Sequence, residues 1–395
     1  MIPKLTKAST VDVEQTDRRR ESHRSMSSPY NRALDGVRGL SIIIVMLFHF
    51  GYLPVGWVGV QIFFVLSGYL ITKILLADKS SSPQHYFARF YWRRTLRIFP
   101  LYYVFMVALT IAYMMSGHPN SLPSDWPWLV TYSANFARLR DGDLPNVVHL
   151  WSLAVEEQFY LMWPFVVFIT SRWTLRRVVI GLLVAAPVLR VVVFAALQWT
   201  GADAVYAGKA VYVLPFTQMD AFAAGAAISL FGLEKMRHAQ TWLLACAGVA
   251  AVAGISVLMA GHLWYGGAFF MSFGFQMYMT SFFEYAWGYS VINITSLVFI
   301  VCILQRYWFA RAVDNAYMAR IGKISYGIYV YHLPLLTIAR ALVDPHDWLG
   351  RFVVFLGWLI IVLVTAEASF RFLESRFLRF KDFFPVVVGR QSSSP

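Results

Sequence analysis

The chain has little charge and almost no cysteine. Only 14% of its 395 residues are Asp, Glu, Lys or Arg, whereas a soluble domain has about 25%. The hydrophobic share is 58%, which leaves too little polar surface for a soluble protein of this length. The two cysteines, Cys246 and Cys302, lie in apolar stretches without metal-ligand spacing. We therefore expect neither a disulfide framework nor a zinc or other metal site.

The N-terminal region shows no pattern of a cleavable signal peptide. Residues 1–31 are polar, basic and rich in serine, which is typical of a disordered cytoplasmic tail. The net charge of +13 does not indicate nucleic-acid binding, because the basic residues lie between apolar stretches rather than along one soluble face. We expect no nucleic-acid partner and a first apolar stretch that remains in the membrane.

Ten apolar stretches follow, each of about the length that a helix needs to cross ~30 Å of hydrocarbon. We predict an all-α integral membrane protein with ten transmembrane helices in one membrane domain, residues 32–375, and a short cytoplasmic tail, residues 376–395. The expected spans are 36–52, 55–77, 99–116, 148–170, 177–198, 211–231, 241–261, 286–305, 321–341 and 352–373.

The positions of Lys and Arg predict how these helices are oriented. With a cytoplasmic N-terminus, 27 of the 34 basic residues fall on the cytoplasmic side and 4 on the outer side. This asymmetry agrees with the positive-inside rule. If one span were missing, every later loop would change to the other side of the membrane and the asymmetry would be hard to obtain. We expect both termini in the cytoplasm and the chain in the cytoplasmic (inner) membrane.

The first span carries ionisable side chains, which are costly inside a membrane and indicate function. Arg38 and His49 are 11 residues apart, about three turns, and so share one helix face, with Asp35 on the same face near the inner end. Arg38 then lies inward and His49 outward, which suits an elongated ligand. Both are expected to be catalytic, and Asp35 to contact substrate. The alternative is an interfacial Asp35–Arg38 pair with a histidine that reaches the outer surface.

The fourth span repeats polar residues at helical spacing. His149, Ser152, Glu156 and Tyr160 form one stripe, in which Glu156 can reach the depth of His49. We predict that Glu156 orients the imidazole and stabilises its protonated form, with Ser152 and Tyr160 near the substrate. A glutamate bonded to neighbouring helices is the alternative.

A basic cluster lies in the expected cytoplasmic loop before the third span. Arg94 and Arg97 are one helical turn apart and can engage one phosphate group, with Arg93 beside them. A phosphate-bearing cytosolic donor would need such a cluster, although the positive-inside rule also explains it.

Further polar residues lie in other spans. Ser67 in the second span, and Tyr326 and His332 in the ninth, are candidate substrate contacts; a helix–helix contact is the alternative for His332. Asp220 in the sixth span needs a partner that the pattern does not reveal.

Taken in order, these motifs resemble the acyltransferase family 3 membrane proteins over residues 30–375. The motifs are Asp35-Gly-Val-Arg38-Gly to His49, Phe63-Phe-Val-Leu-Ser-Gly-Tyr, Arg93-Arg94-x-x-Arg97-Ile-x-Pro, Trp151-Ser-Leu-x-Val-Glu156-x-Gln-Phe-Tyr and Ser325-Tyr-x-x-Tyr-x-x-His332-x-Pro. The resemblance implies a ten-helix enzyme that transfers an acyl group, often acetyl, from cytosolic acyl-CoA to a sugar hydroxyl of an extracytoplasmic polysaccharide or lipid-linked glycan.

The resemblance also assigns roles to residues. The family's Arg-x10-His motif falls on Arg38 and His49, and its Arg-x-x-Arg motif on Arg94 and Arg97. The co-substrate would be an acyl-CoA, with acetyl-CoA the expected one. Its phosphates would bind Arg93, Arg94, Arg97 and Arg38. His49 would act as general base or as an acyl carrier.

This chain also differs from many members of the family. Gln218 stands where many members have an arginine, which casts doubt on a salt bridge of Asp220. Some members also have a C-terminal esterase-like domain, which we do not expect in this chain. A transporter or flippase for a lipid-linked sugar is the alternative function, and the sequence does not indicate the oligomeric state.

Overall fold

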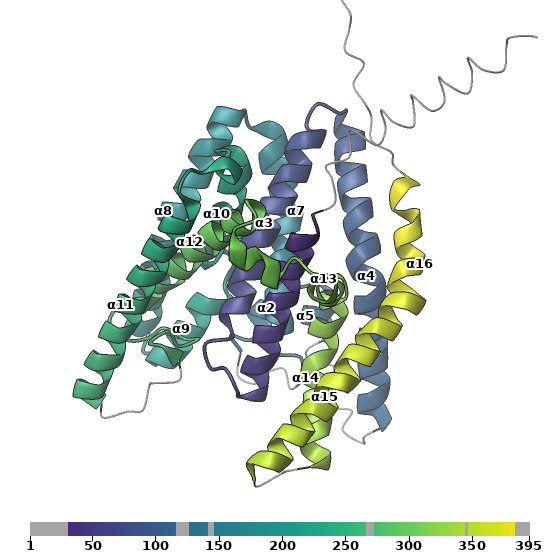
Figure 1. Cartoon of the computed structure of the whole chain (residues 1–395), viewed down its shortest axis with the longest axis vertical. Helices are drawn as coiled ribbons and strands as arrows, with labels where there is room; N and C mark the ends of the chain where they lie inside the picture. Colours follow the sequence, from purple (N-terminus) through teal and green to yellow (C-terminus); the bar gives the residue numbers. More distant parts are fainter. Residues whose placement is uncertain (1–30, 116–125, 141–145, 266–271, 344–346, 384–395) are drawn as a thin grey trace, which may run out of the picture. The chain divides into compact units, whose positions relative to one another are not determined.

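The computed structural model describes residues 31–115, 126–140, 146–265, 272–343 and 347–383, and in these ranges all regular structure is helical (Figure 1). The expected basic tail lies outside the described residues, except for Asn31. The chain divides into two compact units, Met1–Arg32 and Ala33–Pro395. The helices below belong to the second unit, apart from the first residue of α2.

Eight helices in the described residues are long and apolar enough to cross a membrane. The expected all-helical membrane class is therefore confirmed. The eight are α2 (Arg32–Phe50), α3 (Val58–Asp78), α4 (Pro83–Met115), α7 (Leu150–Ile169), α8 (Arg172–Trp199), α11 (Ala239–Tyr265), α12 (Glu284–Leu304) and α15 (Trp348–Ser369).

The stretch 211–231, expected as one span, is divided into three pieces. A proline disfavours helical backbone in the residue before it, and Leu214, which precedes Pro215, has an extended ψ of 137°. The pieces are α9 (Ala204–Val213), the 3-10 turn η1 (Pro215–Thr217) and α10 (Met219–Leu230).

The stretch 321–341 is also divided, at Ile324. Helix α14 has 18 residues, but it is not among the eight candidate spans. The two pieces are α13 (Ala316–Lys323) and α14 (Ser325–Leu342).

Short helices complete the described part of the chain. Those after α15 follow it through a π-helical turn, where the chain bends (Figure 1). The short helices are α5 (Trp126–Val130), α6 (Ala134–Ala137), η2 (Leu233–Lys235), η4 (Trp308–Ala312), η5 (Phe370–Glu374), α16 (Ser375–Leu378) and η6 (Arg379–Phe383).

Helix α4 is longer than the apolar stretch 99–116 predicts. It has 33 residues and begins at Pro83, which makes it about 50 Å long at ~1.5 Å per residue. The basic segment expected as a loop is therefore helical. Its interleaved aromatic residues pack against α7, as the ring contacts of Phe87 with Phe165 and Phe168 show. Arg94 and Arg97 thus stand on a rigid helix that continues through Pro100 into the span.

The backbones of α3 and α10 approach each other closely at the centre of the bundle. A Cβ atom added at Gly68 would collide with the Phe222 carbonyl, and one at Gly225 would collide with the Val65 carbonyl. Small residues permit this approach in membrane helices. Figure 1 shows α2, α3 and α7 between α11 and α12 on one side and α4 and α15 on the other.

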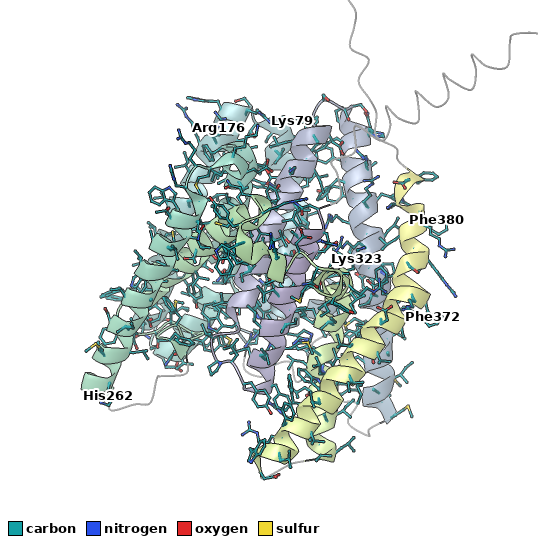
Figure 2. All side chains as sticks on the ribbon, viewed as in Figure 1. Lys79, Arg176, His262, Lys323, Phe372 and Phe380 are labelled. Carbon is teal, nitrogen blue, oxygen red and sulfur yellow. The ribbon has the colours of Figure 1, made fainter. Side chains whose placement is uncertain are left out.

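Basic side chains at one end of the bundle cap helix C-termini. The Lys79 ammonium donates to the Val167 carbonyl at 2.6 Å, and the Arg176 guanidinium donates to the Leu230 carbonyl at 3.1 Å. Such bonds satisfy carbonyls that have no partner within their helix. Figure 2 shows Lys79 and Arg176 at one end of the helices, with His262 at the other.

Candidate active site

A cavity of about 740 Å³, its open mouth included, lies among α2, α3, α4, α7 and α14. Eight of the twelve residues expected at the site line it, so residues distant in the sequence meet here. These eight are Arg38, Ser67, Arg94, Arg97, Ser152, Glu156, Tyr160 and Tyr326, joined by Ser325, Tyr329 and the apolar side chains of Val60, Phe63, Phe64, Ile98 and Leu153.

Three arginines give this cavity its charge. The Arg38 guanidinium is paired with the Asp35 carboxylate at 2.6 Å, so Asp35 supports Arg38 from behind and does not itself line the cavity. Neither Arg94 nor Arg97 has an ion-pair partner in the described part of the chain. Arg94 instead lies over the Tyr160 ring, 5.3 Å from its centroid. Two guanidinium groups that form no ion pair with the described residues favour an anionic ligand.

Arg93 points away from the cavity. Its guanidinium is paired with the Asp382 carboxylate at 2.8 Å, and its Nε donates to the Lys381 carbonyl at 3.2 Å. Adjacent residues on a helix point about 100° apart, so Arg93 and Arg94 cannot face the same ligand. The structure therefore separates Arg93 from the two arginines that line the cavity.

The Glu156 carboxylate has hydroxyl partners rather than the imidazole that the sequence predicted. Both the Ser67 and the Tyr160 hydroxyls donate to Glu156 Oε1, and the Tyr160 hydroxyl also lies 3.1 Å from Ser67 Oγ. The predicted pairing of Glu156 with His49 is absent among these contacts. The spacing on α7 placed Glu156 on the correct face, but its depth relative to His49 depends on how α7 and α2 pack.

His49 lies outside the cavity, in a group of three imidazoles. Its ring centroid is 5.0 Å from that of His332, and the His332 centroid is 4.8 Å from that of His149. These residues come from the end of α2, from α14 and from the residue before α7. We call them the histidine cluster. His332, expected to contact substrate, therefore lies beside the predicted catalytic histidine.

Tyr329 and Ser152 connect the cavity to the histidine cluster. Both line the cavity, and their hydroxyl oxygens lie 2.5 Å apart. The Tyr329 hydroxyl is also 2.7 Å from the His149 carbonyl. This pair forms the end of the cavity beside the histidine cluster. Tyr326, one turn further in, donates to the Ile98 carbonyl at 2.9 Å.

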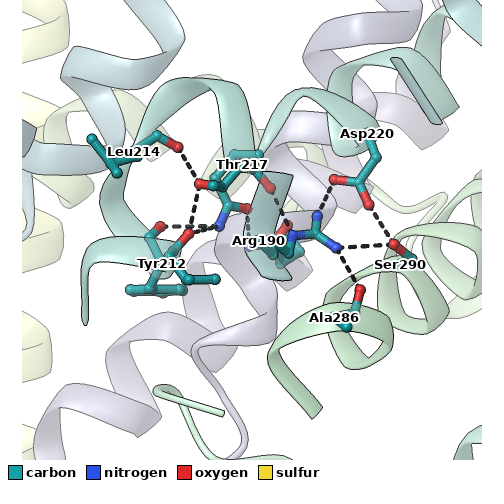
Figure 3. Close-up of polar contacts among 10 residues, drawn as sticks. Arg190, Tyr212, Leu214, Thr217, Asp220, Ala286 and Ser290 are labelled. Carbon is teal, nitrogen blue, oxygen red and sulfur yellow. Dashed lines mark hydrogen bonds and ion pairs between the residues drawn. The ribbon is translucent and has the colours of Figure 1, made fainter. Parts of the chain in front are cut away.

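The structure identifies the partner of Asp220 as Arg190 of α8. Their side chains form an ion pair, with 0% and 1% of the side-chain surface exposed. Ser290 donates to Asp220 Oδ2 at 2.7 Å, and Arg190 Nε donates to the Thr217 carbonyl at 2.8 Å (Figure 3). A salt-bridged Asp220 thus exists despite Gln218. Arg190 in the middle of 177–198 and Asp220, the one acidic residue within 211–231, were the signal for this pair, because charges inside a membrane are usually paired.

Arg138 is a second buried cation that sequence reasoning did not single out. It is 6% exposed, and its Nη2 donates to the Tyr278 hydroxyl at 2.8 Å. It lies within electrostatic reach of His49. No pattern in the sequence could have placed an outer-loop arginine near the end of α2.

The described residues contain no group of three or more His, Cys, Asp or Glu side chains placed to hold a metal ion. The three rings of the histidine cluster therefore do not form such a group.

The profile of the acyltransferase family 3 domain, described as "Acyltransferase domain", matches residues 31–367. The chain belongs to this family. The match includes every helix that lines the cavity and every residue of the histidine cluster.

Curated relatives carry names of O-acetyltransferases. Peptidoglycan O-acetyltransferase OatA of Listeria monocytogenes is 29% identical over 378 residues, 88% of this chain and 56% of the relative. O-acetyltransferase OatA of Staphylococcus aureus is 25% identical over 375 residues, which are 89% of this chain and 58% of the relative. The putative peptidoglycan O-acetyltransferase YrhL of Bacillus subtilis is 27% identical over 392 aligned positions, which cover 89% of this chain and 55% of the relative. The alignments thus span little more than half the length of these relatives. No solved structure matches the chain.

Proposed function

We propose that this member of the acyltransferase family is a membrane O-acetyltransferase. It transfers an acetyl group from cytosolic acetyl-CoA to a hydroxyl of an extracytoplasmic polysaccharide or lipid-linked glycan. The observation that carries the proposal is that Arg94 and Arg97, which form no ion pair with the described residues, lie on the wall of a cavity that ends beside the histidine cluster. The names of the relatives suggest cell-wall peptidoglycan as an acceptor.

The charges of the chain support a cytoplasmic entrance for the donor. The 27-to-4 asymmetry of Lys and Arg puts both termini and the N-terminal half of α4 on the cytoplasmic side. In this topology the divided segments α9–α10 and α14 complete ten crossings of the cytoplasmic membrane. The phosphates of coenzyme A bind Arg94 and Arg97. The ion pair with Asp35 holds the Arg38 side chain in position to join them.

The neutral arm of the donor then extends along the cavity toward Tyr329 and Ser152, which puts the thioester near His49. The His49 imidazole removes the proton of the acceptor hydroxyl while its oxygen attacks the thioester carbonyl. The bond to sulfur breaks, the new ester forms, and the proton passes to the departing thiolate to give free coenzyme A. In the covalent variant, His49 first takes the acetyl group itself. Glu156 keeps Ser67 and Tyr160 in place along the donor path.

Inside-out vesicles give a direct test. Radiolabelled acetyl-CoA is supplied at the exposed cytoplasmic face, and label is sought on extracted glycan. We expect transfer by the wild type and its loss in His49→Ala, because a missing general base or nucleophile costs at least about 100-fold. His262→Ala, at the exposed end of α11, is the matched control and should stay active. Undiminished transfer by His49→Ala would exclude the assignment. Sugar movement without consumption of acetyl-CoA would indicate a transporter instead.

A further inference from the structure

The histidine cluster contains a buried ring nitrogen without a hydrogen-bond partner. His149 and His332 are 2% and 0% exposed. Within the described residues, Nε2 of His332 lacks a partner. An unpartnered buried polar atom is costly, and most folded proteins avoid it. Such an atom beside the predicted catalytic imidazole therefore points to a use in the reaction.

The contacts of His332 fix which of its nitrogens carries the proton. Its Nδ1 lies 2.6 Å from the Tyr329 carbonyl oxygen. A carbonyl oxygen can only accept a hydrogen bond, so the proton of the neutral ring resides on Nδ1. Nε2 of His332 is then a bare acceptor. The Trp358 indole, which donates to the His332 carbonyl at 2.9 Å, holds this turn of α14 in place.

His49 needs an acceptor of this kind, because no carboxylate of the described residues is among its electrostatic neighbours. Glu156, the acidic partner that the sequence predicted, is bonded to Ser67 and Tyr160 instead. The titratable groups within electrostatic reach of His49 are His332, His149, Arg138 and Arg340. The Arg340 guanidinium also donates to the His49 backbone carbonyl at 3.1 Å.

Both nearby arginines oppose positive charge on the His49 ring. A proton taken up by His49 is therefore stabilised only if a neighbouring group shares it. His332 is the neighbour whose free nitrogen can do so.

We propose that His332 is the positioning residue of His49 and shares its proton during acyl transfer. This inference rests on the proposed acetyltransferase function. One nitrogen of His49 takes the hydroxyl proton, and the N–H of the other donates to His332 Nε2. The ring centroids are 5.0 Å apart with planes tilted by 53°, so a rotation of the His49 ring closes the bond. Catalytic hydrogen bonds are often long in unliganded enzymes. The proton returns through His49 to the thiolate of coenzyme A.

Two substitutions separate this role from simple packing. His332→Gln keeps an acceptor near the position of Nε2, whereas His332→Phe keeps the ring volume and loses the acceptor. Each variant is assayed in the same vesicles with radiolabelled acetyl-CoA, after its melting temperature in detergent has been compared with that of the wild type. We expect His332→Phe to lower kcat by roughly 100-fold, and His332→Gln to retain at least about ten times the kcat of His332→Phe. KM for acetyl-CoA should be unchanged in both.

The outcomes distinguish this inference from the function on which it rests. Equal kcat values in the Gln and Phe variants, or an effect confined to KM, would overturn the role of His332 while leaving the acetyltransferase intact. Absence of transfer by the wild type would refute the function itself. If His332→Phe fails to insert, His332→Leu takes its place in the comparison. Tyr331→Phe is the neighbouring control, because its hydroxyl contacts Ser369 of α15 at 3.2 Å and faces away from the cluster.

Discussion

At the scale of single residues, the three adjacent arginine positions on α4 have different surroundings. Arg94 and Arg97 line the cavity without an ion-pair partner among the described residues, while Arg93 is paired with Asp382. The sequence placed all three in one phosphate-binding cluster, because residue type and spacing do not show what each side chain meets. The ion pair of Arg93 with Asp382 does, whereas helical spacing alone puts position 97 within about 60° of both 93 and 94.

These surroundings predict different effects on donor binding. Arg97→Gln and Arg94→Gln should each raise KM for acetyl-CoA about 10- to 100-fold, because a hydrogen bond to a charged group contributes about 1.5–3 kcal/mol. Arg93→Gln is the matched control and should change KM less than about twofold. Initial rates over a range of acetyl-CoA concentrations measure all three. A control as impaired as the other two would refute the assignment of the donor site to the cavity.

At the scale of elements, the sequence predicted the long apolar helices and missed the breaks. Uniform hydrophobicity reveals a span such as α8 or α12, but it does not show that 211–231 is divided at Pro215. Nor does it show which depth two helices share, so the stripe of Ser152, Glu156 and Tyr160 was found, while the partners of Glu156 in the structure are Ser67 and Tyr160 rather than His49. The ion pair between Arg190 and Asp220 connects α10 to α8.

Loss of this pair should destabilise the helix bundle. Asp220→Ala leaves the Arg190 guanidinium buried without its carboxylate, which costs about 3–5 kcal/mol in buried pairs of this kind. Asp382→Ala breaks an exposed pair, in which the Asp382 side chain is 66% exposed, and should cost at most about 1 kcal/mol. Thermal unfolding in detergent compares the two. An Asp220→Ala protein that unfolds no earlier than Asp382→Ala would show that the buried pair contributes little.

At the scale of the whole molecule, the proposed reaction requires a direction across the membrane. The donor site on α4 must face the cytoplasm and the end of α2 must face outward, because acetyl-CoA is cytosolic and the acceptor glycan is not. The asymmetry of basic residues gives that direction from the sequence. The structure adds that Lys79 and Arg176 lie at the end of the helices opposite His262 (Figure 2).

Two exposed positions at opposite ends test this orientation. In a chain whose Cys246 and Cys302 are replaced by serine, Ser80→Cys lies in the turn between α3 and α4, and His262→Cys lies at the end of α11. A membrane-impermeant maleimide added to intact cells, with any outer barrier made permeable, should label His262→Cys only. In inside-out vesicles it should label Ser80→Cys only, because the charge asymmetry puts the turn before α4 in the cytoplasm. Labelling of both positions from one side would refute the proposed orientation. It would therefore also refute a cytoplasmic entrance for the donor and a donor path from Arg97 to His49.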